Sequence, residues 1–344
     1  MSETERRRLG RSGLDVPAMG IGTDSWGEKL LGYGKRYHDD DLYQAYRACL
    51  DAGLNFFDTA EGYAGGASET LIGKFRRRDG RHIVVATKFD NPILFSRWLK
   101  KGRPGSVVAA LDASLKRLGV ERVDLYQVHF PLPAEAIDGF MDLLATQVKA
   151  GKVRAVGVSN FSADLMRQAH GSLAARHMAL ASNQVCYNLL HRHPEANGVL
   201  AACRELEIAL IAYTPLATGV LTGKYRHGAA NSTLTQRLFL RLVQFDPFHE
   251  WADRPPLMRR LLSKPRALQF QRLGPLFQCM QEIGDAHGKS IAQVALSWLL
   301  AADPRVIPIP GAKNVRQARE NAGAQDWRLS AEERDRISAA EAAA

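Results

Sequence analysis

The stretch AVGVSNFSADLMRQAH, residues 155–170, joins a short apolar run to a helical pattern. Its first part, Ala155–Val158, has the length and the content of a buried strand. Its second part, Ala163–His170, has the apolar spacing of a helix, and Ser162 directly before it is a good N-cap. A strand followed at once by a helix is the unit of a parallel sheet with helices on its faces.

The same unit recurs on both sides of this stretch. The predicted strands are Met19–Gly22, Phe56–Thr59, Ile83–Thr87, Leu125–Val128, Ala155–Val158, Ala181–Val185, Ala209–Tyr213 and Val306–Ile309. The predicted helices are Asp41–Asp51, Ser68–Phe75, Gly105–Leu118, Ala134–Ala150, Ala163–His170, Glu195–Glu205, Leu276–His287, Ile291–Ala301 and Val315–Asn321. Repeats in this order, without a break, favour a closed (β/α)₈ TIM barrel of the α/β class over an open doubly wound sheet.

A chain of 344 residues is long for one domain, but barrels with insertions reach this length. We therefore expect one domain over residues 1–344. A small β-hairpin is expected at 7–17, ahead of the first strand, and an alanine-rich tail at 325–344. Residues 226–274 interrupt the rhythm after the seventh strand, so we expect a long insertion over the mouth of the barrel.

Composition excludes several classes of protein. Hydrophobic residues make up 46% and charged residues 24%, which are ordinary globular values. No apolar stretch is long enough to span a bilayer, and no apolar segment follows the charged N-terminus as in a secretory signal. The four cysteines are far apart, which favours reduced thiols over disulfides or a zinc site. We expect a cytoplasmic protein with no metal and no membrane partner.

The chain carries a net charge of +10. A basic surface of this kind is compatible with nucleic-acid binding. No recognised nucleic-acid motif accompanies the charge, however, so we interpret it as a solvated surface together with a site for an anionic cofactor.

Three neighbouring strands end in titratable residues. Asp58 ends the second predicted strand, Lys88 the third and His129 the fourth, and Tyr63 lies in the loop after Asp58. In a barrel of this type the carboxyl ends of the strands share one mouth, where functional groups gather. Each of these residues alone is more often structural than catalytic, but their joint occurrence favours a site.

Their chemistry is coherent. A tyrosine has a reference pKa of about 10, and a nearby ammonium lowers it by favouring the phenolate. Lys88 would act in this way on Tyr63, while Asp58 keeps Lys88 charged and in place. Tyr63 could then protonate the oxygen of a substrate carbonyl, and His129 would donate a hydrogen bond to that oxygen.

These motifs resemble the aldo-keto reductase superfamily. The similarity is carried by Asn55–Tyr63, Ala86–Lys88, Asp124–His129, Gly157–Phe161, Asn183–Gln184, Tyr213–Ala217 and Pro308–Gly311, in the order and spacing of the family. It covers about residues 6–330. The resemblance implies a barrel that binds NADP(H) and a catalytic tetrad of Asp58, Tyr63, Lys88 and His129, with Tyr63 as the proton donor.

The resemblance also implies a set of cofactor-binding residues. Besides Asp58, these are Gly22, Thr23, Ser159, Asn160, Gln184, Tyr213, Thr214, Pro215, Leu216, Gly219, Lys224, Gly311, Lys313, Gln317, Glu320 and Asn321. Among them, Tyr213 matches the aromatic residue that stacks on the nicotinamide. Asn314 stands where many members have an arginine for the 2′-phosphate, so NAD(H) is the alternative cofactor; Lys313 and its basic neighbours favour NADP(H).

The expected activity is the reversible reduction of an aldehyde or ketone to an alcohol. Trp26, Phe89 and Phe130 are candidates for the wall of the substrate pocket. The alternative from another class is a nucleotide-binding barrel that acts mainly as a regulatory or assembly subunit, because the fold alone does not decide function. The sequence does not identify the substrate.

Overall fold

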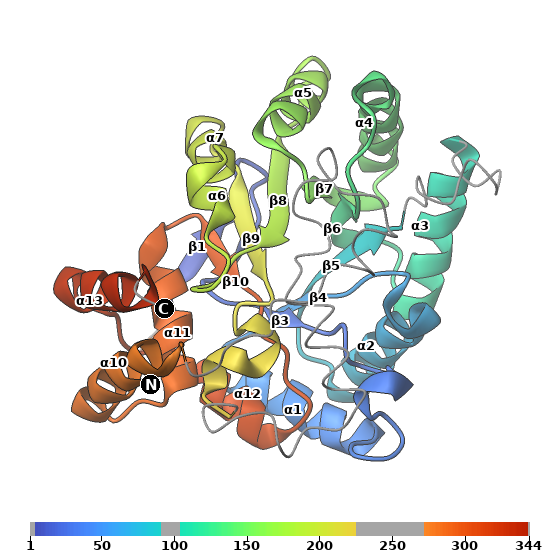
Figure 1. The fold of residues 1–344 in the computed structure, drawn as a ribbon. Helices are drawn as coiled ribbons and strands as arrows, with labels where there is room; N and C mark the ends of the chain where they lie inside the picture. The colour runs from blue at the N-terminus through green and yellow to red at the C-terminus, as the bar shows by residue number, and fades with distance from the viewer. Residues whose placement is uncertain (1–3, 91–103, 225–271, 343–344) are drawn as a thin grey trace, which may run out of the picture.

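The computed structural model of the chain describes residues 4–90, 104–224 and 272–342. Nearly all of the expected insertion at 226–274 lies outside the described residues. The described residues form one curved sheet with helices around it, and a small hairpin at one end (Figure 1).

The sheet has eight strands in the order β10-β9-β8-β7-β6-β5-β4-β3, and every neighbouring pair is parallel. The strands are β3 (Ile21–Gly22), β4 (Phe56–Asp58), β5 (Val84–Phe89), β6 (Val123–Val128), β7 (Val153–Ser159), β8 (Leu180–Cys186), β9 (Ala209–Tyr213) and β10 (Val306–Pro308). The first and last strands also meet, because Gly20 N donates to Pro308 O at 2.9 Å and Gly22 pairs with Gly311. The sheet therefore closes, and the predicted (β/α)₈ barrel is confirmed.

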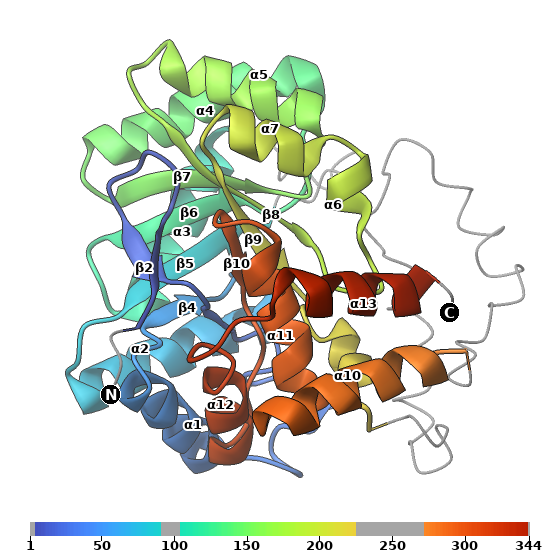
Figure 2. The same ribbon diagram turned by 90° about the vertical axis from the view of Figure 1, so that its left-hand side faces the viewer.

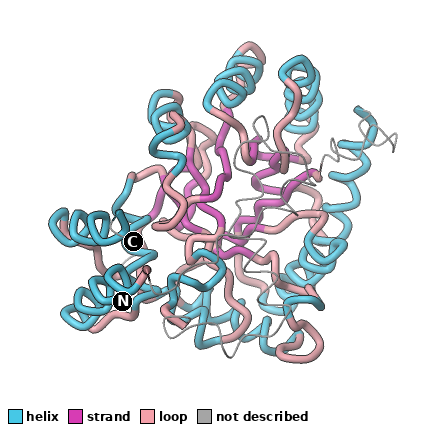
Figure 3. The backbone as a smooth tube through the Cα atoms, viewed as in Figure 1, coloured by secondary structure: helices cyan, strands magenta, loops and turns pink. Residues whose placement is uncertain are grey.

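Helices surround the strands (Figure 3). They are α1 (Asp39–Asp51), α2 (Ala67–Asp79), α3 (Pro104–Leu118), α4 (Ala134–Lys149), α5 (Ala163–Ala174), α6 (His193–Ala196), α7 (Val199–Glu205), α10 (Gly274–His287), α11 (Ile291–Ala302), α12 (Val315–Ala322) and α13 (Ala331–Ala342). Three short 3₁₀ segments follow strands in the described part of the chain: η1 (Lys29–Leu31), η2 (Tyr63–Gly66) and η3 (Ala217–Thr222).

Side chains alternate between two cores. Along β5, Val84 and Ala86 belong to the core inside the barrel, whereas Val85 and Phe89 belong to the core between strands and helices. This is the expected consequence of a two-residue period. The inside core also includes Leu14 of the hairpin, which covers one end of the barrel (Figure 2).

That hairpin consists of β1 (Arg6–Arg8) and β2 (Asp15–Pro17), which pair antiparallel where the sequence predicted a hairpin. Two helical predictions differ from the structure. The expected helix 195–205 is divided into α6 and α7, because Gly198 adopts a φ of 82° between them. The tail at 325–344 contains the helix α13, which packs beside α10.

Candidate active site

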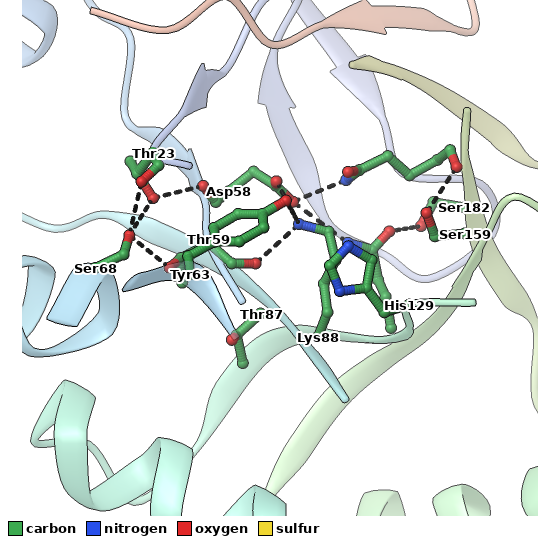
Figure 4. A network of polar contacts seen from close by, with 12 residues as sticks. Thr23, Asp58, Thr59, Tyr63, Ser68, Thr87, Lys88, His129, Ser159 and Ser182 are labelled. Carbon is green, nitrogen blue, oxygen red and sulfur yellow. Dashed lines mark hydrogen bonds and ion pairs between the residues drawn. The ribbon is translucent and has the colours of Figure 1, made fainter. Parts of the chain in front are cut away.

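Four titratable side chains converge at the carboxyl ends of β4, β5 and β6 (Figure 4). Lys88 is at the centre. Its Nζ donates to Oδ1 of Asp58 at 2.6 Å and to the hydroxyl of Tyr63 at 3.0 Å. It also donates to the carbonyl of Thr59 at 2.9 Å, so all three of its protons have acceptors. The structure thus brings together the lysine, carboxylate and phenol that the sequence placed at one mouth.

The strand period explains why these groups meet. Phe56 and Ala86 point into the barrel, and Asp58 and Lys88, two residues further on, therefore point to the same side. In the sheet register Asp58 is paired with Ala86, which places Lys88 just beyond it on the next strand. Both side chains are buried, with 1% and 0% exposure. A buried ion pair of this kind needs additional hydrogen bonds.

Asp58 receives those bonds from two glutamines. Gln184 Nε2 donates to Oδ2 of Asp58 at 2.8 Å, and Gln127 Nε2 lies 3.4 Å from the same oxygen. Ser182 donates to the carbonyl oxygen of the Gln127 side chain at 3.2 Å. Sequence reasoning missed Gln127, because it read the residue as part of a strand run. The available signal was an amide at an inward-facing position of that strand.

The electrostatics of the lysine and the tyrosine are coupled. Burial alone would lower the pKa of Lys88, but the charge of Asp58 and the hydrogen bonds to Asp58 and Tyr63 raise it above the usual value, so the ammonium is retained. Burial raises the pKa of Tyr63 above the ordinary value, and Lys88 opposes this only in part. The sequence-based expectation of a lowered tyrosine pKa is therefore corrected. Tyr63 is a neutral phenol at physiological pH.

His129 lies at the rim, directly after β6. Its ring stands edge-on to Tyr63, with centroids 5.8 Å apart, and stacks on Phe130 at 4.5 Å. Its Nδ1 is hydrogen-bonded to Oδ1 of Asp90. Burial lowers the pKa of His129, and Asp90 opposes that effect. Sequence analysis did not single out Asp90, which follows β5 by one residue.

The next three strand ends carry the residues expected around a nicotinamide. The Ser159 hydroxyl donates to the Gln184 carbonyl at 2.9 Å, and the Tyr213 hydroxyl donates to Oδ1 of Asn160 at 3.0 Å. Asn160 has a φ of 62°, and its Nδ2 donates to the His129 carbonyl at 3.2 Å. These hydrogen bonds connect the ends of β6, β7, β8 and β9 along the same rim.

The loop after β9 has an unusual backbone. Thr214, Ala217 and Thr218 have positive φ angles, which non-glycine residues rarely adopt. Pro215 and Leu216 lie between the first two of them. The hydroxyl of Thr218 is buried without a hydrogen-bond partner.

This loop approaches a basic side chain. A Cβ added to Gly219 would lie 2.6 Å from Nζ of Lys224, so the lysine folds over the glycine. An unpaired hydroxyl and a lysine in one strained loop fit an anionic group such as a pyrophosphate.

The first and last strands carry a second group of expected cofactor residues. Gly22 is bridged to Gly311, and the Thr23 hydroxyl donates to the Asp58 carbonyl at 2.8 Å. Asn321, from α12, donates to the Gly311 carbonyl at 3.2 Å. Helix α12 is thereby fixed to the rim through its own side chain.

The start of α12 is basic. Asn314 is its N-cap and accepts a hydrogen bond from Gln317 N at 3.0 Å, while the Gln317 side chain accepts from Lys313 N at 2.8 Å. Burial lowers the pKa of Lys313, the charge of Asp24 opposes this effect, and the charges of Lys224 and Arg36 add to it.

Beside this helix lies a cavity of about 420 Å³ lined by Asp40, Asp41, Gln44, Asn314, Val315 and Arg316. Arg316 also forms an ion pair with Glu320 at 3.5 Å. The lining combines Arg316 with two carboxylates and two amides, and the partly buried Lys313 directly precedes Asn314 in the chain.

The three aromatic candidates for the substrate pocket have different positions. Trp26 is fully buried against Phe57 and Phe75, and its indole N–H donates to the Ala312 carbonyl at 2.9 Å. Phe89 is also in the outer core, beside Phe140. Both therefore correct the expectation of a pocket wall, because they face the helices instead of the mouth.

Phe130 stays a candidate, since it stacks on His129 at the rim and is only partly buried. Within the described residues, no cluster of three or more His, Cys, Asp or Glu side chains is arranged to hold a metal ion. No helix in the same part of the chain has the length and apolar character needed to cross a membrane.

Comparison with known proteins finds relatives of this chain in sequence and in structure. The sequence model of the Aldo/keto reductase family matches residues 18–342. The chloroplastic pyridoxal reductase of Arabidopsis thaliana is 33% identical over 337 residues, covering 93% of this chain and 82% of the relative. The aldo-keto reductase yakc [NADP(+)] of Schizosaccharomyces pombe is 32% identical, covering 92% and 89%. The crystal structure of a thermostable aldo-keto reductase with the inhibitor epalrestat has a TM-score of 0.69 at 28% identity, covering 98% and 99%.

Proposed function

The chain belongs to the aldo/keto reductase family and is an NAD(P)H-dependent oxidoreductase, and from this premise we propose that it reduces an aldehyde or ketone with Tyr63 as the general acid. The single observation that carries the proposal is the position of Lys88. Its ammonium contacts the Tyr63 hydroxyl at 3.0 Å and the Asp58 carboxylate at 2.6 Å, inside a buried site.

The proton chemistry follows from these contacts. Tyr63 is protonated at neutral pH, so it holds the proton that a carbonyl oxygen needs when it becomes an alkoxide. When that proton leaves, the phenolate faces the Lys88 ammonium, whose charge stabilises it. Asp58, held by Gln184, keeps the ammonium protonated and aimed at Tyr63. His129 is the second polar group at the rim and would orient the carbonyl oxygen.

The residues of the rim fit a nicotinamide dinucleotide. The bound cofactor would supply the hydride, which Tyr63 complements with a proton. Ser159, Asn160, Gln184 and Tyr213 would surround the nicotinamide. The unpaired Thr218 hydroxyl and Lys224 would contact the pyrophosphate.

The adenosine half would lie at α12, with Gln317, Glu320 and Asn321. Lys313 and Arg316 would supply the positive charge for a 2′-phosphate in place of the arginine that Asn314 replaces. This charge favours NADPH over NADH.

The net charge and the cysteines support two further parts of the proposal. The excess positive charge serves the anionic cofactor instead of a nucleic acid. None of the described cysteines forms a disulfide, which suits the reducing cytosol, where we place the enzyme. The rival function, a regulatory or assembly subunit, would retain NADPH binding without turnover.

The test is NADPH oxidation with a panel of aldehydes and ketones, pyridoxal included because a relative is named for it. Tyr63→Phe removes the proton donor and leaves the ring in place. We expect a loss of kcat of about 10²–10⁴-fold with an unchanged Kd for NADPH. Full turnover in this variant would refute the assigned role. Absence of turnover in the wild type, with a larger protein co-purifying in equal amount, would favour the rival.

A further inference from the structure

The contact between Asp90 and His129 has no role in the proposed proton transfer. Asp90 lies one residue beyond β5, and its Oδ1 is hydrogen-bonded to Nδ1 of His129. The two side chains are 29% and 14% exposed, so the pair is protected from solvent more than an ordinary surface pair. This hydrogen bond holds the imidazole ring of His129, the residue that would contact the substrate.

The surroundings of Asp90 support this carboxylate specifically. Glu61 Oε1 accepts a hydrogen bond from the backbone N–H of Asp90 at 2.8 Å. A Cβ added to Gly62 would lie 1.7 Å from Oδ2 of Asp90, so a side chain at position 62 would displace the carboxylate from this position. On the other side, Asn160 holds the His129 backbone carbonyl at 3.2 Å. Two loops, one after β4 and one after β7, thus fix the carboxylate and the imidazole relative to each other.

The contact determines where the imidazole proton is. A carboxylate only accepts hydrogen bonds, so Nδ1 of His129 must carry a proton. A neutral imidazole has one N–H, which leaves Nε2 with a lone pair. Because Asp90 occupies Nδ1, Nε2 is the ring nitrogen left for a substrate. In the neutral ring that nitrogen is an acceptor, and a carbonyl oxygen needs a donor.

We infer that Asp90 is a positioning residue that keeps the His129 proton on Nδ1, so that His129 donates from Nε2 to a carbonyl oxygen only as the imidazolium. This inference rests on the proposed function for its consequence in catalysis, but the position of the proton is a property of the protein alone. It makes reduction sensitive to pH through His129 instead of through Tyr63.

The charged groups around His129 set the direction of that sensitivity. Lys88 on β5 disfavours the imidazolium, whereas Asp90 and Asp58 favour it. Tyr63, the side chain that faces the ring from η2, is neutral in this pH range. Glu61 lies behind Asp90 and titrates near neutrality. Burial is the largest effect and lowers the pKa of His129, so the donor form is lost as the pH rises.

The first experiment reads the proton directly, by ¹⁵N NMR of the histidine-labelled protein with and without NADPH. In the wild type at high pH we expect the protonated nitrogen of His129 to be Nδ1. In Asp90→Ala and in Asp90→Asn we expect the protonated nitrogen to be Nε2. The asparagine amide N–H can donate to Nδ1, which then carries no proton. Asp164→Asn removes a carboxylate that is 97% exposed and is the matched control. An Nε2 proton in the wild type, or no change in either Asp90 variant, would overturn the inference.

The second experiment measures kcat/KM for carbonyl reduction against pH. The wild-type value should fall by about tenfold per pH unit above the pKa of His129. Asp90→Ala should remove this fall, because the neutral imidazole of His129 can donate from Nε2 in that variant. In a His129→Gln background, Asp90→Ala should leave the profile unchanged. A wild-type profile that is flat, or an Asp90→Ala profile that keeps the fall, would overturn the inference. Lack of turnover on every carbonyl would instead refute the proposed function, since the NMR result needs no substrate.

Discussion

Gln184 Nε2 and Lys88 Nζ bind opposite oxygens of the Asp58 carboxylate, at 2.8 Å and 2.6 Å. The glutamine comes from β8 and the lysine from β5, so the carboxylate is held from both sides of the barrel interior. An anion inside a protein is tolerated only when its remaining lone pairs are also satisfied. Gln184 therefore stabilises the negative charge of Asp58, which in turn keeps Lys88 protonated. This role is additional to any contact that Gln184 makes with a cofactor.

We predict that Gln184→Leu destabilises the protein and impairs the ion pair. The substitution leaves Oδ2 of Asp58 with only the longer contact to Gln127. We expect a loss of about 1–3 kcal/mol in the free energy of unfolding, which urea denaturation measures. Gln184→Glu should cost more, because it places a second carboxylate against Asp58. An unchanged stability in both variants would contradict this account.

A second buried carboxylate offers a similar test away from the tetrad. Glu69 is fully buried and accepts from the Thr87 hydroxyl at 2.5 Å and from Arg117 Nε at 2.6 Å. Arg117→Ala should destabilise the fold by about 3–5 kcal/mol, because the charge of Glu69 then has no cation. Adding Glu69→Gln to Arg117→Ala should recover part of the loss, as thermal unfolding would report. Equal stability of the single and double variants would show that the charge is not the cause.

The sequence predicted the contact at the centre of the site, between Asp58 and Lys88, from the positions of these residues in two neighbouring strands. Asp58 and Lys88 end strands and share the inward-facing position, so their contact follows from the parallel register alone. Gln127 was missed because it was read only as part of a strand, although the two-residue period from the inward-facing Leu125 places it on the inward face. Asp90 was missed because its partner comes from another strand, 39 residues along the chain.

Two further differences between prediction and structure concern Trp26 and helix α13. Trp26 follows the first strand like a rim residue, but the chain turns so that its indole reaches the carbonyl of Ala312. Helix α13 was read as a tail because its sequence is rich in alanine; in the structure only Ile337 of this helix is buried. The missed signal was local: Ser330 and Glu333 form a reciprocal cap, with Glu333 N donating to the serine hydroxyl at 3.1 Å and Ser330 N to the glutamate at 2.8 Å.

Tyr63 predicts different pH profiles for the two directions of the reaction. Because its pKa is raised, the phenol is present at all pH values from 6 to about 9, so Tyr63 adds no pH dependence to reduction. Alcohol oxidation needs the phenolate, whose fraction rises by about tenfold per pH unit below the pKa. We therefore expect kcat/KM for oxidation to rise steadily up to pH 9.

Lys88→Met tests the same relationship. Without the ammonium the pKa of Tyr63 rises further, so oxidation at pH 9 should lose activity relative to the wild type even where NADP⁺ still binds. A plateau of wild-type oxidation near pH 7 would mean that the tyrosine is more acidic than its burial implies.

Glu61 predicts a pH dependence of stability. Burial raises its pKa from 4.5 to about 7, with the charges of Asp90 and Glu69 acting in the same direction. A carboxyl whose pKa is raised on folding stabilises the protein fully below the unfolded value, and this contribution is lost as the pH rises through the folded value. The window is therefore pH 4.5 to about 7.

The variant Glu61→Gln isolates this effect, because its amide oxygen can still accept from Asp90 N. The wild type should lose on the order of 1–2 kcal/mol more than the variant between pH 5 and pH 8, after allowance for the partial exposure of Glu61. Urea unfolding at the two pH values measures the difference. The exposed Glu332→Gln is the control and should follow the wild type. A parallel decline in Glu61→Gln would mean that another group is responsible.

Lys313 predicts how the protein distinguishes NADPH from NADH. Its Nζ lies 5.2 Å from the centroid of the Tyr37 ring, and the charges of Lys224 and Arg36 are close enough to affect its pKa. Burial and the charges of Lys224 and Arg36 disfavour the charged form of Lys313, whereas Asp24 favours it. A phosphate that binds beside these cations gains from the charge of Lys313, so Lys313→Met should weaken NADPH binding. We expect the Kd for NADPH to rise by about 10-fold or more and to depend less on salt, whereas the Kd for NADH changes little, because only NADPH has the additional phosphate. Fluorescence titration at two ionic strengths gives both constants, and an equal weakening for the two cofactors would place Lys313 at the pyrophosphate instead.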